Sequence, residues 1–362
     1  LWLLFPAAGV AEERGWQPDR TWVFVIGVLE WKHSEVYGSF PVKARRDAEL
    51  VEFFKLQNVP AEQIVYLQDK KATAAEIKAA LSTLLAKTKE GDLLFLYYCG
   101  HGHKPDTAST FFASYDAGDK DVPGWSVSSI VADIERDFKG ARAILTADCC
   151  YSGTLAQEAQ KEDHRVSYAV LASSSASESS TDKWTFTEAL LSGLRGRAFV
   201  DLDGDGCVTI EEMGTNIEED MAFADGQRAT FATTGGFPPG TVMSKAGAKS
   251  SADCGRRVGV LWGDKWWKAQ VIDFKEGKSR IHYYWWDESW DEWVTADRIR
   301  EAKLVEYEIG SEVEVEWHGK WYPAEVLKVD RGVHLIHYTG YDSSWDEWVS
   351  PKRIREPGTE EK

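Results

Sequence analysis

LLFLYYCGHG at residues 93–102 and ARAILTADCCYSG at residues 141–153 are the two stretches that decide the fold. Each is an apolar, β-prone run that stops abruptly at small residues carrying a reactive side chain. The first run delivers the imidazole of His101, and the second delivers a thiol, at Cys150 or its neighbour Cys149. A cysteine nucleophile needs a base or ion-pair partner to become a thiolate, and histidine is the usual one. The two runs predict nucleophilic chemistry at two strand ends.

Strand and helix patterns alternate around these runs. Further strands are predicted at 21–28, 64–67 and 167–172, and helices at 44–56, 73–86, 127–138 and 186–194. Such alternation is typical of an α/β fold with a mostly parallel sheet flanked by helices. In open sheets of this kind the chemistry lies beyond the carboxyl ends of the strands. His101 and Cys150 both follow such ends.

Composition excludes several classes of protein. The chain of 362 residues is long enough for two or three domains. Its net charge of −17 argues against a nucleic-acid partner, whose surface would be basic. No apolar segment is long enough to span a membrane. The five cysteines match neither a disulfide framework nor a zinc site. The acidity suits cationic substrates or partners.

The first residues have the character of a leader. Residues 1–11, LWLLFPAAGVA, are apolar and end in small residues, and the chain turns polar directly afterwards. This pattern is typical of the end of a secretory signal peptide, although a buried N-terminal strand is the alternative. We therefore expect residues 1–15 to be a signal-peptide remnant and the protein to be exported to the periplasm or beyond.

The second half of the chain contains a linker and a duplication. Residues 235–254 are rich in Gly, Pro, Ser and Ala, which predicts an interdomain linker. A shift of 55 residues lays 258–301 on 313–356 without a gap, and about half of the positions are identical. Short alternating runs broken by turns predict two small antiparallel barrels. The predicted domains are a catalytic domain at 20–234 and barrels at 255–302 and 308–357.

The strand-end motifs carry a family resemblance. YCGHG at 98–102 and DCCYSG at 148–153 resemble the caspase-like cysteine peptidases of clan CD, family C14, most closely bacterial caspase homologues and metacaspases. Residues 46–48 and 186–190 support the likeness, which covers about 20–200. It implies a caspase–hemoglobinase fold in which Cys150 is the nucleophile and His101 the catalytic imidazole. The backbone N–H groups of Gly102 and Cys150 would then form the oxyanion hole.

Alternatives and departures accompany this assignment. Cys149 and Cys150 cannot both face the cleft, because adjacent residues at a strand end point opposite ways. His103 is a second imidazole, two residues after His101. Tyr151 stands where metacaspases usually have His, and Cys99 stands where they usually have Ser. Neither residue is required for the chemistry.

The resemblance also implies a substrate preference. Metacaspases cut after Arg or Lys, and Asp148 and Asp47 match the acidic residues of their substrate pocket. A pair of carboxylates would complement a cationic side chain. The alternative is that Asp148 only caps a helix.

Residues 201–212, DLDGDGCVTIEE, reproduce the spacing of an EF-hand loop. The expected Ca²⁺ ligands are Asp201, Asp203, Asp205, the Cys207 carbonyl, Thr209 and Glu212. The alternative is a degenerate Asp/Gly-rich loop. Catalysis itself requires no cofactor in this interpretation.

The duplicated barrels resemble chromo-barrel or Tudor-knot domains, which are small SH3-like barrels. In the eukaryotic members an aromatic cage holds methylated lysine. The matching positions are Trp267, Tyr283, Trp286 and Trp290 in the first repeat, and His318, Tyr322, Tyr338, Tyr341 and Trp345 in the second. Aromatic faces attract ammonium groups, so a cationic or methyl-lysine-like ligand is expected. The alternative is that these rings form the barrel cores.

These observations together predict a cysteine endopeptidase that cuts protein or peptide substrates after Arg or Lys through a Cys–His dyad, with barrels as targeting or ligand-binding modules. The alternative function is a catalytically inactive caspase-like scaffold that acts as a peptide or methyl-lysine-type binding protein.

Overall fold

The computed structural model describes residues 15–105, 109–119, 122–161, 163–178, 180–302 and 305–359. Its centre is a six-stranded sheet in the order β10-β8-β7-β3-β1-β2, in which β10 alone is antiparallel. The strands are β1 (Thr21–Gly27), β2 (Ile64–Gln68), β3 (Leu93–Cys99), β7 (Arg142–Asp148), β8 (Ser167–Ala172) and β10 (Thr230–Thr234). The predicted leader at residues 1–15 lies outside the described residues except for Gly15.

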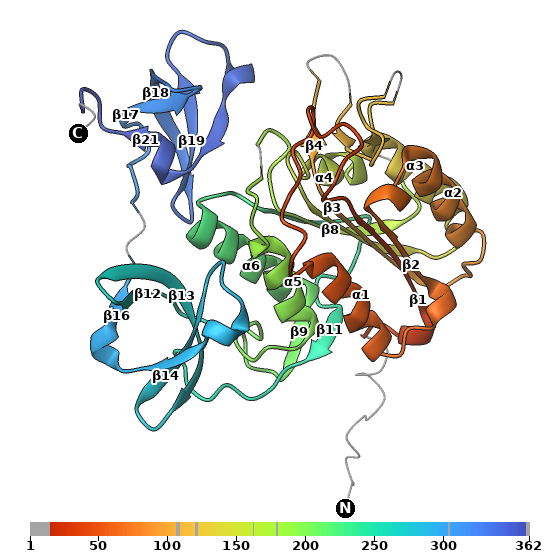
Figure 1. Cartoon of the computed structure of the whole chain (residues 1–362), viewed down its shortest axis with the longest axis horizontal. Coiled ribbons are helices and arrows are strands. Elements are labelled where there is room, and N and C mark those ends of the chain that lie inside the picture. Colours follow the sequence, from red (N-terminus) through yellow and green to blue (C-terminus); the bar gives the residue numbers. More distant parts are fainter. Residues whose placement is uncertain are drawn as a thin grey trace, which may run out of the picture.

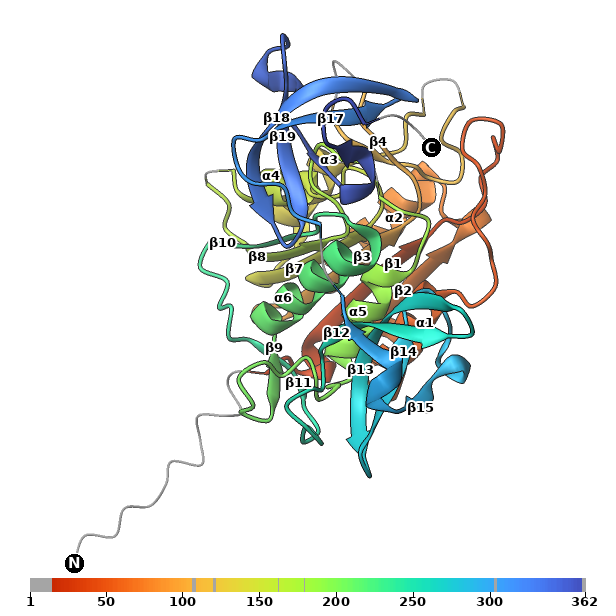
Figure 2. The ribbon, with the colours of Figure 1, turned by 90° about the vertical axis from the view of Figure 1, so that its left-hand side faces the viewer.

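Helices cover both faces of this sheet (Figure 1, Figure 2). Helices α2 (Ala74–Leu85), α3 (Val127–Asp137) and α4 (Thr154–Ala159) contribute to one apolar core. Helices α1 (Arg46–Leu56), α5 (Thr185–Leu194) and α6 (Ile210–Asp220) contribute to the other, and a π-helical turn at Met221–Asp225 continues α6. Strands β3 and β7 are buried almost throughout, which explains their continuous apolar runs.

Smaller elements complete the peptidase-like part of the chain. A three-stranded sheet is formed by β4 (Gly102–His103), β5 (Phe111–Phe112) and β6 (Trp125–Ser126). Strand β9 (Cys207–Thr209) pairs with β11 (Val242–Lys245). Short 3-10 turns lie at Pro18–Arg20, Ala61–Gln63, Asp69–Lys71, Glu288–Trp290, Ala296–Arg298, Ser343–Trp345 and Pro351–Arg353.

The segment expected to be a linker, 235–254, is more ordered than its composition suggests. Its residues 242–245 form β11, and Phe237, Met243 and Cys254 are buried. Trp16 also donates its indole N–H to the carbonyl oxygen of Met243, at 2.5 Å. Apolar residues spaced among the glycines therefore tie this segment to the catalytic domain, so it is not a free tether.

Two five-stranded barrels follow, and their matched architecture explains the sequence duplication. The first contains β12 (Arg257–Trp262), β13 (Lys265–Lys275), β14 (Lys278–Tyr283), β15 (Glu292–Val294) and β16 (Ile299–Glu301). The second contains β17 (Glu312–Trp317), β18 (Lys320–Asp330), β19 (Val333–Tyr338), β20 (Glu347–Val349) and β21 (Ile354–Arg355). Both have the same strand order, and β13 and β18 carry a bulge at equivalent positions.

The α/β sheet followed by antiparallel barrels confirms the predicted fold class. Figure 1 shows the first barrel beside α5 and α6, and the second barrel beyond α6. Among the described residues, no helix combines the length and apolar character needed to cross a bilayer.

Candidate active site

Parallel pairing of β3 with β7 brings the two reactive motifs together. Cys99 lies opposite Asp148 in this pairing, and His101 and Cys150 each follow two residues later. The loops then touch, because a Cβ atom added at Gly102 would lie 2.0 Å from the Cys150 carbonyl oxygen. Only glycine permits this approach. The structure therefore places Gly102 against the backbone of Cys150.

The two neighbouring cysteines lie in different environments. Cys149 is buried in the core, and its burial raises the pKa of the thiol well above the ordinary value. Cys150 is partly exposed, and the backbone N–H of Ser180 lies 3.1 Å from its sulfur. These environments favour Cys150 as the sulfur that a substrate can reach.

The imidazole of His101 is held through its Nε2 atom. Its Nε2 lies 2.8 Å from the carbonyl oxygen of Gly38, and the rings of Trp31 and Phe40 lie 4.6 Å from it, centroid to centroid. A carbonyl only accepts, so Nε2 carries the proton and Nδ1 keeps its lone pair. Burial lowers the pKa of His101, although the Gly38 carbonyl opposes this effect. A neutral imidazole at pH 7 suits a general base.

The second imidazole, that of His103, contacts Phe111 and Tyr37. Its ring stacks on Phe111 with a centroid separation of 5.4 Å, and its Nδ1 lies 3.2 Å from the Tyr37 hydroxyl. Burial also lowers the pKa of His103.

A group of serines that follows β8 supports the cysteine loop, and sequence reasoning missed it. The backbone N–H of Cys149 donates to Ser173 Oγ at 3.0 Å, and Ser174 Oγ donates to the Cys149 carbonyl at 3.0 Å. The available signal was the polar run ASSSASESS at 172–180, directly after a strand that neighbours β7. Its hydroxyls fix the backbone that presents Cys150.

A pocket of about 180 Å³ opens beside these strand ends. Its lining includes Cys99, Gly100, Asp148, Phe40, Trp184 and Trp285. The Asp148 carboxyl is 9% exposed and accepts a hydrogen bond of 2.6 Å from Thr187 Oγ1. Desolvation raises the pKa of Asp148 to about 7. The structure therefore places the Asp148 carboxyl in the lining of this pocket.

Asp47, the other expected pocket acid, is placed differently. It is fully buried and does not line this pocket. Its Oδ2 lies 2.8 Å from Arg45 Nη2 and accepts a hydrogen bond of 2.7 Å from the Tyr66 hydroxyl. The Asp47 carboxylate is thus buried in an ion pair with Arg45 of the same chain. This corrects the expectation that Asp47 contacts substrate. Glu188, paired with Arg46 at 2.7 Å, lines the pocket instead.

The loop at 201–212 brings three of the expected Ca²⁺ ligands together. Carboxylate oxygens of Asp201, Asp203 and Asp205 lie within 4.8 Å of one another. Asp201 accepts hydrogen bonds from the backbone N–H groups of Gly204 and Gly206, which curls the loop around its carboxylate. Glu212 turns back to the loop, because its Oε1 accepts the Leu202 N–H at 2.8 Å. This set of hard oxygen donors fits Ca²⁺.

Two residues of the predicted ligand set play structural roles that the spacing did not reveal. Thr209 caps α6 through a capping box with Glu212. The Thr209 hydroxyl accepts the backbone N–H of Glu212, and the Glu212 carboxylate accepts the backbone N–H of Thr209. Cys207 starts β9 and pairs with Lys245. The loop is therefore joined to both α6 and the β9–β11 ribbon.

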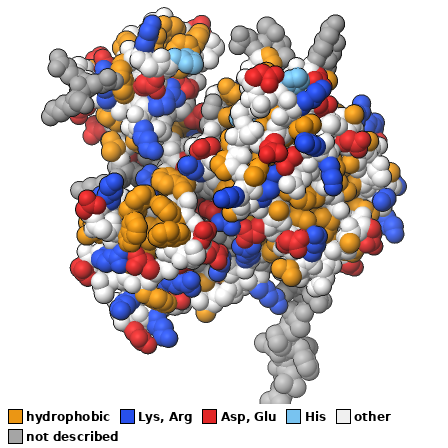
Figure 3. Space-filling view, viewed as in Figure 1, with side chains coloured by type: hydrophobic (Ala, Val, Ile, Leu, Met, Phe, Trp, Pro, Cys, Tyr) orange, Lys and Arg blue, Asp and Glu red, His pale blue; other side chains and the backbone are white. Residues whose placement is uncertain are grey.

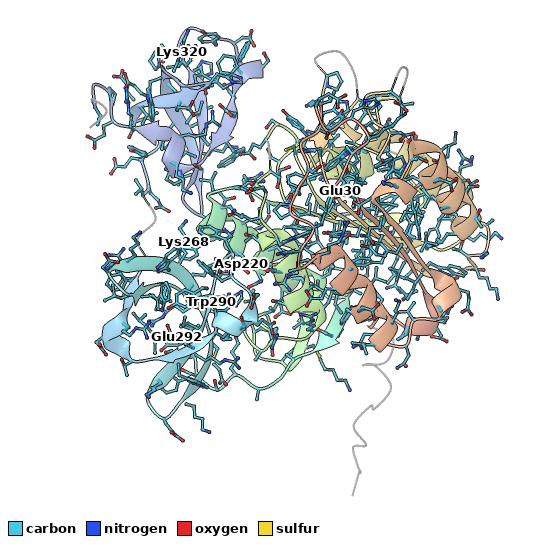
Figure 4. The ribbon with its side chains drawn as sticks, in the orientation of Figure 1. Glu30, Asp220, Lys268, Trp290, Glu292 and Lys320 are labelled. Carbon is cyan, nitrogen blue, oxygen red and sulfur yellow. The ribbon has the colours of Figure 1, made fainter. Side chains whose placement is uncertain are left out.

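The barrels carry closed rings of aromatic side chains. In the first barrel, ring contacts of 5.0–6.5 Å join Trp267, Trp286 and Trp290 through Trp262. They line a pocket of about 210 Å³ together with Tyr283 and Glu292. Figure 3 shows hydrophobic side chains gathered on this barrel, and Figure 4 places Trp290 and Glu292 there.

In the second barrel, ring contacts of 5.6–6.2 Å join Tyr322, Tyr338, Tyr341 and Trp345 through Trp317. His318 packs on Trp317, with a centroid separation of 4.5 Å. Sequence reasoning chose His318 and missed the two tryptophans that close the rings, Trp262 and Trp317. Their equivalence under the 55-residue shift was the available signal.

Comparisons with known proteins agree with this organisation. Residues 46–158 match the model of the metacaspase peptidase C14 domain, and residues 307–356 match the Tudor-knot, described as the RNA binding activity-knot of a chromodomain. Metacaspase-7 of Arabidopsis thaliana is 30% identical over 104 residues, which cover 25% of this chain and 23% of that protein. The chain thus spans about a quarter of the length of this curated relative.

Solved structures give weaker matches. A protein of Geobacter sulfurreducens is 14% identical, with a TM-score of 0.44, over 63% of this chain and all of that one. The structure titled Tbtudor is 26% identical, with a TM-score of 0.14, over 14% of this chain and 97% of that one.

The matched models agree with an α/β domain joined to SH3-like barrels, and the first of these parts is similar to caspase-like peptidases. Residues 46–158 are similar to a metacaspase peptidase C14 domain, and residues 307–356 are similar to a Tudor-knot domain.

Proposed function

We propose that the protein is a cysteine endopeptidase that cleaves after Arg or Lys through a dyad of His101 and Cys150. The observation that carries the proposal is the meeting of the two motif loops, in which Gly102 packs on the Cys150 carbonyl. The acid Asp148 in the adjoining pocket supports a cationic substrate side chain.

The proposed mechanism needs only groups of this chain. The Cys150 proton passes to Nδ1 of His101, and the sulfur attacks the peptide carbonyl. The backbone N–H groups of Gly102 and Cys150 stabilise the oxyanion. His101 then protonates the leaving amine as the acyl-thioester forms, and it activates the water that releases the acid product. The Gly38 carbonyl holds the imidazole in the tautomer that this sequence requires.

The neighbouring cysteines provide a matched test. Cys150→Ala should abolish cleavage of Arg and Lys reporter peptides, whereas Cys149→Ala should retain it because the Cys149 thiol is buried. Activity is measured by mass spectrometry of a peptide library, with and without Ca²⁺. Equal activity of the two variants would remove the assignment of the nucleophile. A wild-type protein that cleaves no library member would favour the inactive scaffold.

We further propose that the barrels bind a cationic, methyl-lysine-like group of a peptide. The support is the closed aromatic ring of each barrel, whose faces attract a cation. Trp290→Ala and Trp345→Ala should each weaken binding of a trimethyl-lysine peptide in calorimetry. Acidic residues outnumber basic ones in 307–356, so binding of RNA in preference to that peptide would contradict the proposal.

Calcium binding at 201–212 and export of the protein complete the proposal. The donor geometry of the loop supports the first, and an extracellular compartment rich in calcium would suit a loop of this kind. Export rests on the leader-like composition of residues 1–11 alone.

A further inference from the structure

The first barrel is fixed to the catalytic domain by buried polar contacts. At the end of α6, Asp220 accepts a hydrogen bond of 2.5 Å from the Tyr284 hydroxyl and forms an ion pair of 2.8 Å with Arg257. Lys268 donates to the carbonyl oxygen of Phe223 at 2.6 Å. Figure 4 shows Asp220 and Lys268 at this junction. The position of the barrel is therefore set relative to the strand ends of the catalytic sheet.

This docking delivers one barrel residue to the pocket beside Cys150. Trp285, in the turn after β14, lines the same pocket as Asp148 and Trp184. Its indole N–H donates to Asp225 Oδ1 at 2.9 Å, and Asp225 Oδ2 accepts a hydrogen bond from Thr181 Oγ1 at 3.3 Å. The indole is thus anchored by a carboxylate of the catalytic domain, and 37% of Trp285 remains exposed.

The backbone shows that this side chain is not a requirement of the barrel fold. Trp285 has φ of 71°, a left-handed conformation that is costly for a bulky residue. The 55-residue shift places Gly340 at the equivalent position, with φ of 88°. The turn therefore prefers glycine, which the second barrel has. The first barrel carries tryptophan where its side chain reaches the pocket.

We infer that Trp285 is a specificity-determining residue, by which the first barrel completes the substrate pocket. This inference rests on the proposed peptidase function, and it adds Trp285 to the residues that contact the substrate. The cationic side chain of the substrate lies against the indoles of Trp184 and Trp285, with Asp148 as its counter-charge. Cation–π attraction in a desolvated site then adds to the ion pair. The other charged groups that line the pocket are Lys43, Asp182, Lys183 and Glu188, of which Asp182 lies 3.5 Å from Lys183 and Glu188 pairs with Arg46.

The test uses full-length Trp285→Gly, which copies the residue of the second barrel and removes the indole without adding backbone strain. Reporter peptides carry Arg, Lys or the neutral isostere norleucine before the cut. Trp285→Gly should lower kcat/KM for the Arg and Lys reporters about 10-fold and change the norleucine value by less than about 2-fold. Trp293→Ala, a 40% exposed tryptophan of the same barrel outside the pocket, is the control and should match wild type.

The outcomes separate this inference from the proposed function. An unchanged Arg-to-norleucine ratio in Trp285→Gly, with an unfolding temperature no lower than wild type, overturns the inference alone. If wild type cleaves no reporter, the peptidase proposal fails. Alkylation of Cys150 by Arg and norleucine chloromethyl ketones, followed by intact mass, then decides the inference. Faster labelling by the Arg reagent that disappears in Trp285→Gly supports it, and equal labelling overturns it.

Discussion

Residues of the same type receive opposite environments in this site. Cys149 is buried while its neighbour Cys150 is partly exposed, because the chain turns at Tyr151, whose φ is 58°. Asp47 is paired with Arg45, whereas Asp148 accepts a hydrogen bond from the hydroxyl of Thr187. The identities of the reactive residues could be predicted from the strand-end motifs. The burial of Asp47 could not, because it packs against Gly27 and Tyr66, which lie far from it along the chain.

The buried Asp148 carboxyl should make stability depend on pH. Desolvation raises its folded pKa to about 7, from an ordinary value of 3.8, so the folded state holds a proton that the unfolded state loses. The free energy of unfolding should therefore fall as pH rises from about 4 to about 7, by at most about 1.4 kcal/mol per pH unit.

Asp148→Asn tests this dependence, because asparagine keeps an acceptor for Thr187 and does not titrate. Relative to wild type, the variant should gain stability across that pH window in urea titrations at pH 5 and pH 8. Glu178, whose pKa burial also raises to about 7, titrates in both proteins and cancels in the difference. Parallel stability profiles of the two proteins would contradict the expectation.

At the scale of elements, strand ends and one helix organise the function. The alternation of strands and helices was predictable, because both faces of β3 and β7 are covered by amphipathic helices. Helix α6 was not among the predicted helices, although its capping box, Thr209 with Glu212, was visible in the sequence. It runs from the 201–212 loop to the turn that carries Asp225, the residue that anchors Trp285.

Calcium should stabilise this helix end. Added Ca²⁺ should raise the unfolding temperature of the wild-type protein. Asp203→Asn should weaken Ca²⁺ affinity at least about 10-fold. The variant should keep the wild-type unfolding temperature in EDTA, because Asp203 is exposed and asparagine still accepts the backbone hydrogen bond of the turn. Calorimetry and thermal unfolding measure both effects.

Glu212→Ala is the matched contrast. It removes a ligand and the capping box together, so the free energy of unfolding should fall by about 1 kcal/mol even in EDTA. An unfolding temperature that ignores Ca²⁺ in the wild type would rule out the metal site.

For the whole molecule, the two barrels share a sequence pattern and differ in their attachment. Arg257 of the first barrel pairs with the buried Asp220, and its side chain is 17% exposed. Arg331 of the second barrel pairs with Glu218 at 3.1 Å, and its side chain is 34% exposed. The duplication can be recognised from the sequence. The residues that attach each barrel to the catalytic domain, however, are at non-equivalent positions of the two repeats.

These two arginines predict different effects on stability. Arg257→Ala leaves the Asp220 carboxylate buried without its cation, so the free energy of unfolding of the catalytic domain with the first barrel should fall by about 3 kcal/mol. Arg331→Ala removes a more exposed pair and should cost less than about 1 kcal/mol. Urea unfolding followed by tryptophan fluorescence measures both, and equal losses would show that the first barrel is not held through Asp220.

The sequence by itself determined the α/β class, the reactive strand ends, the calcium-loop spacing and the repeated barrel, because these depend on local periodicity and on motifs contiguous in the chain. Only the tertiary structure decided which acid reaches the pocket, which rings close each aromatic cage and where Trp285 lies. Those outcomes depend on contacts between distant segments, such as Trp285 with Asp225, that no local pattern encodes. The pocket beside the strand ends is thus lined both by residues of those ends and by Trp285, from a barrel far along the chain.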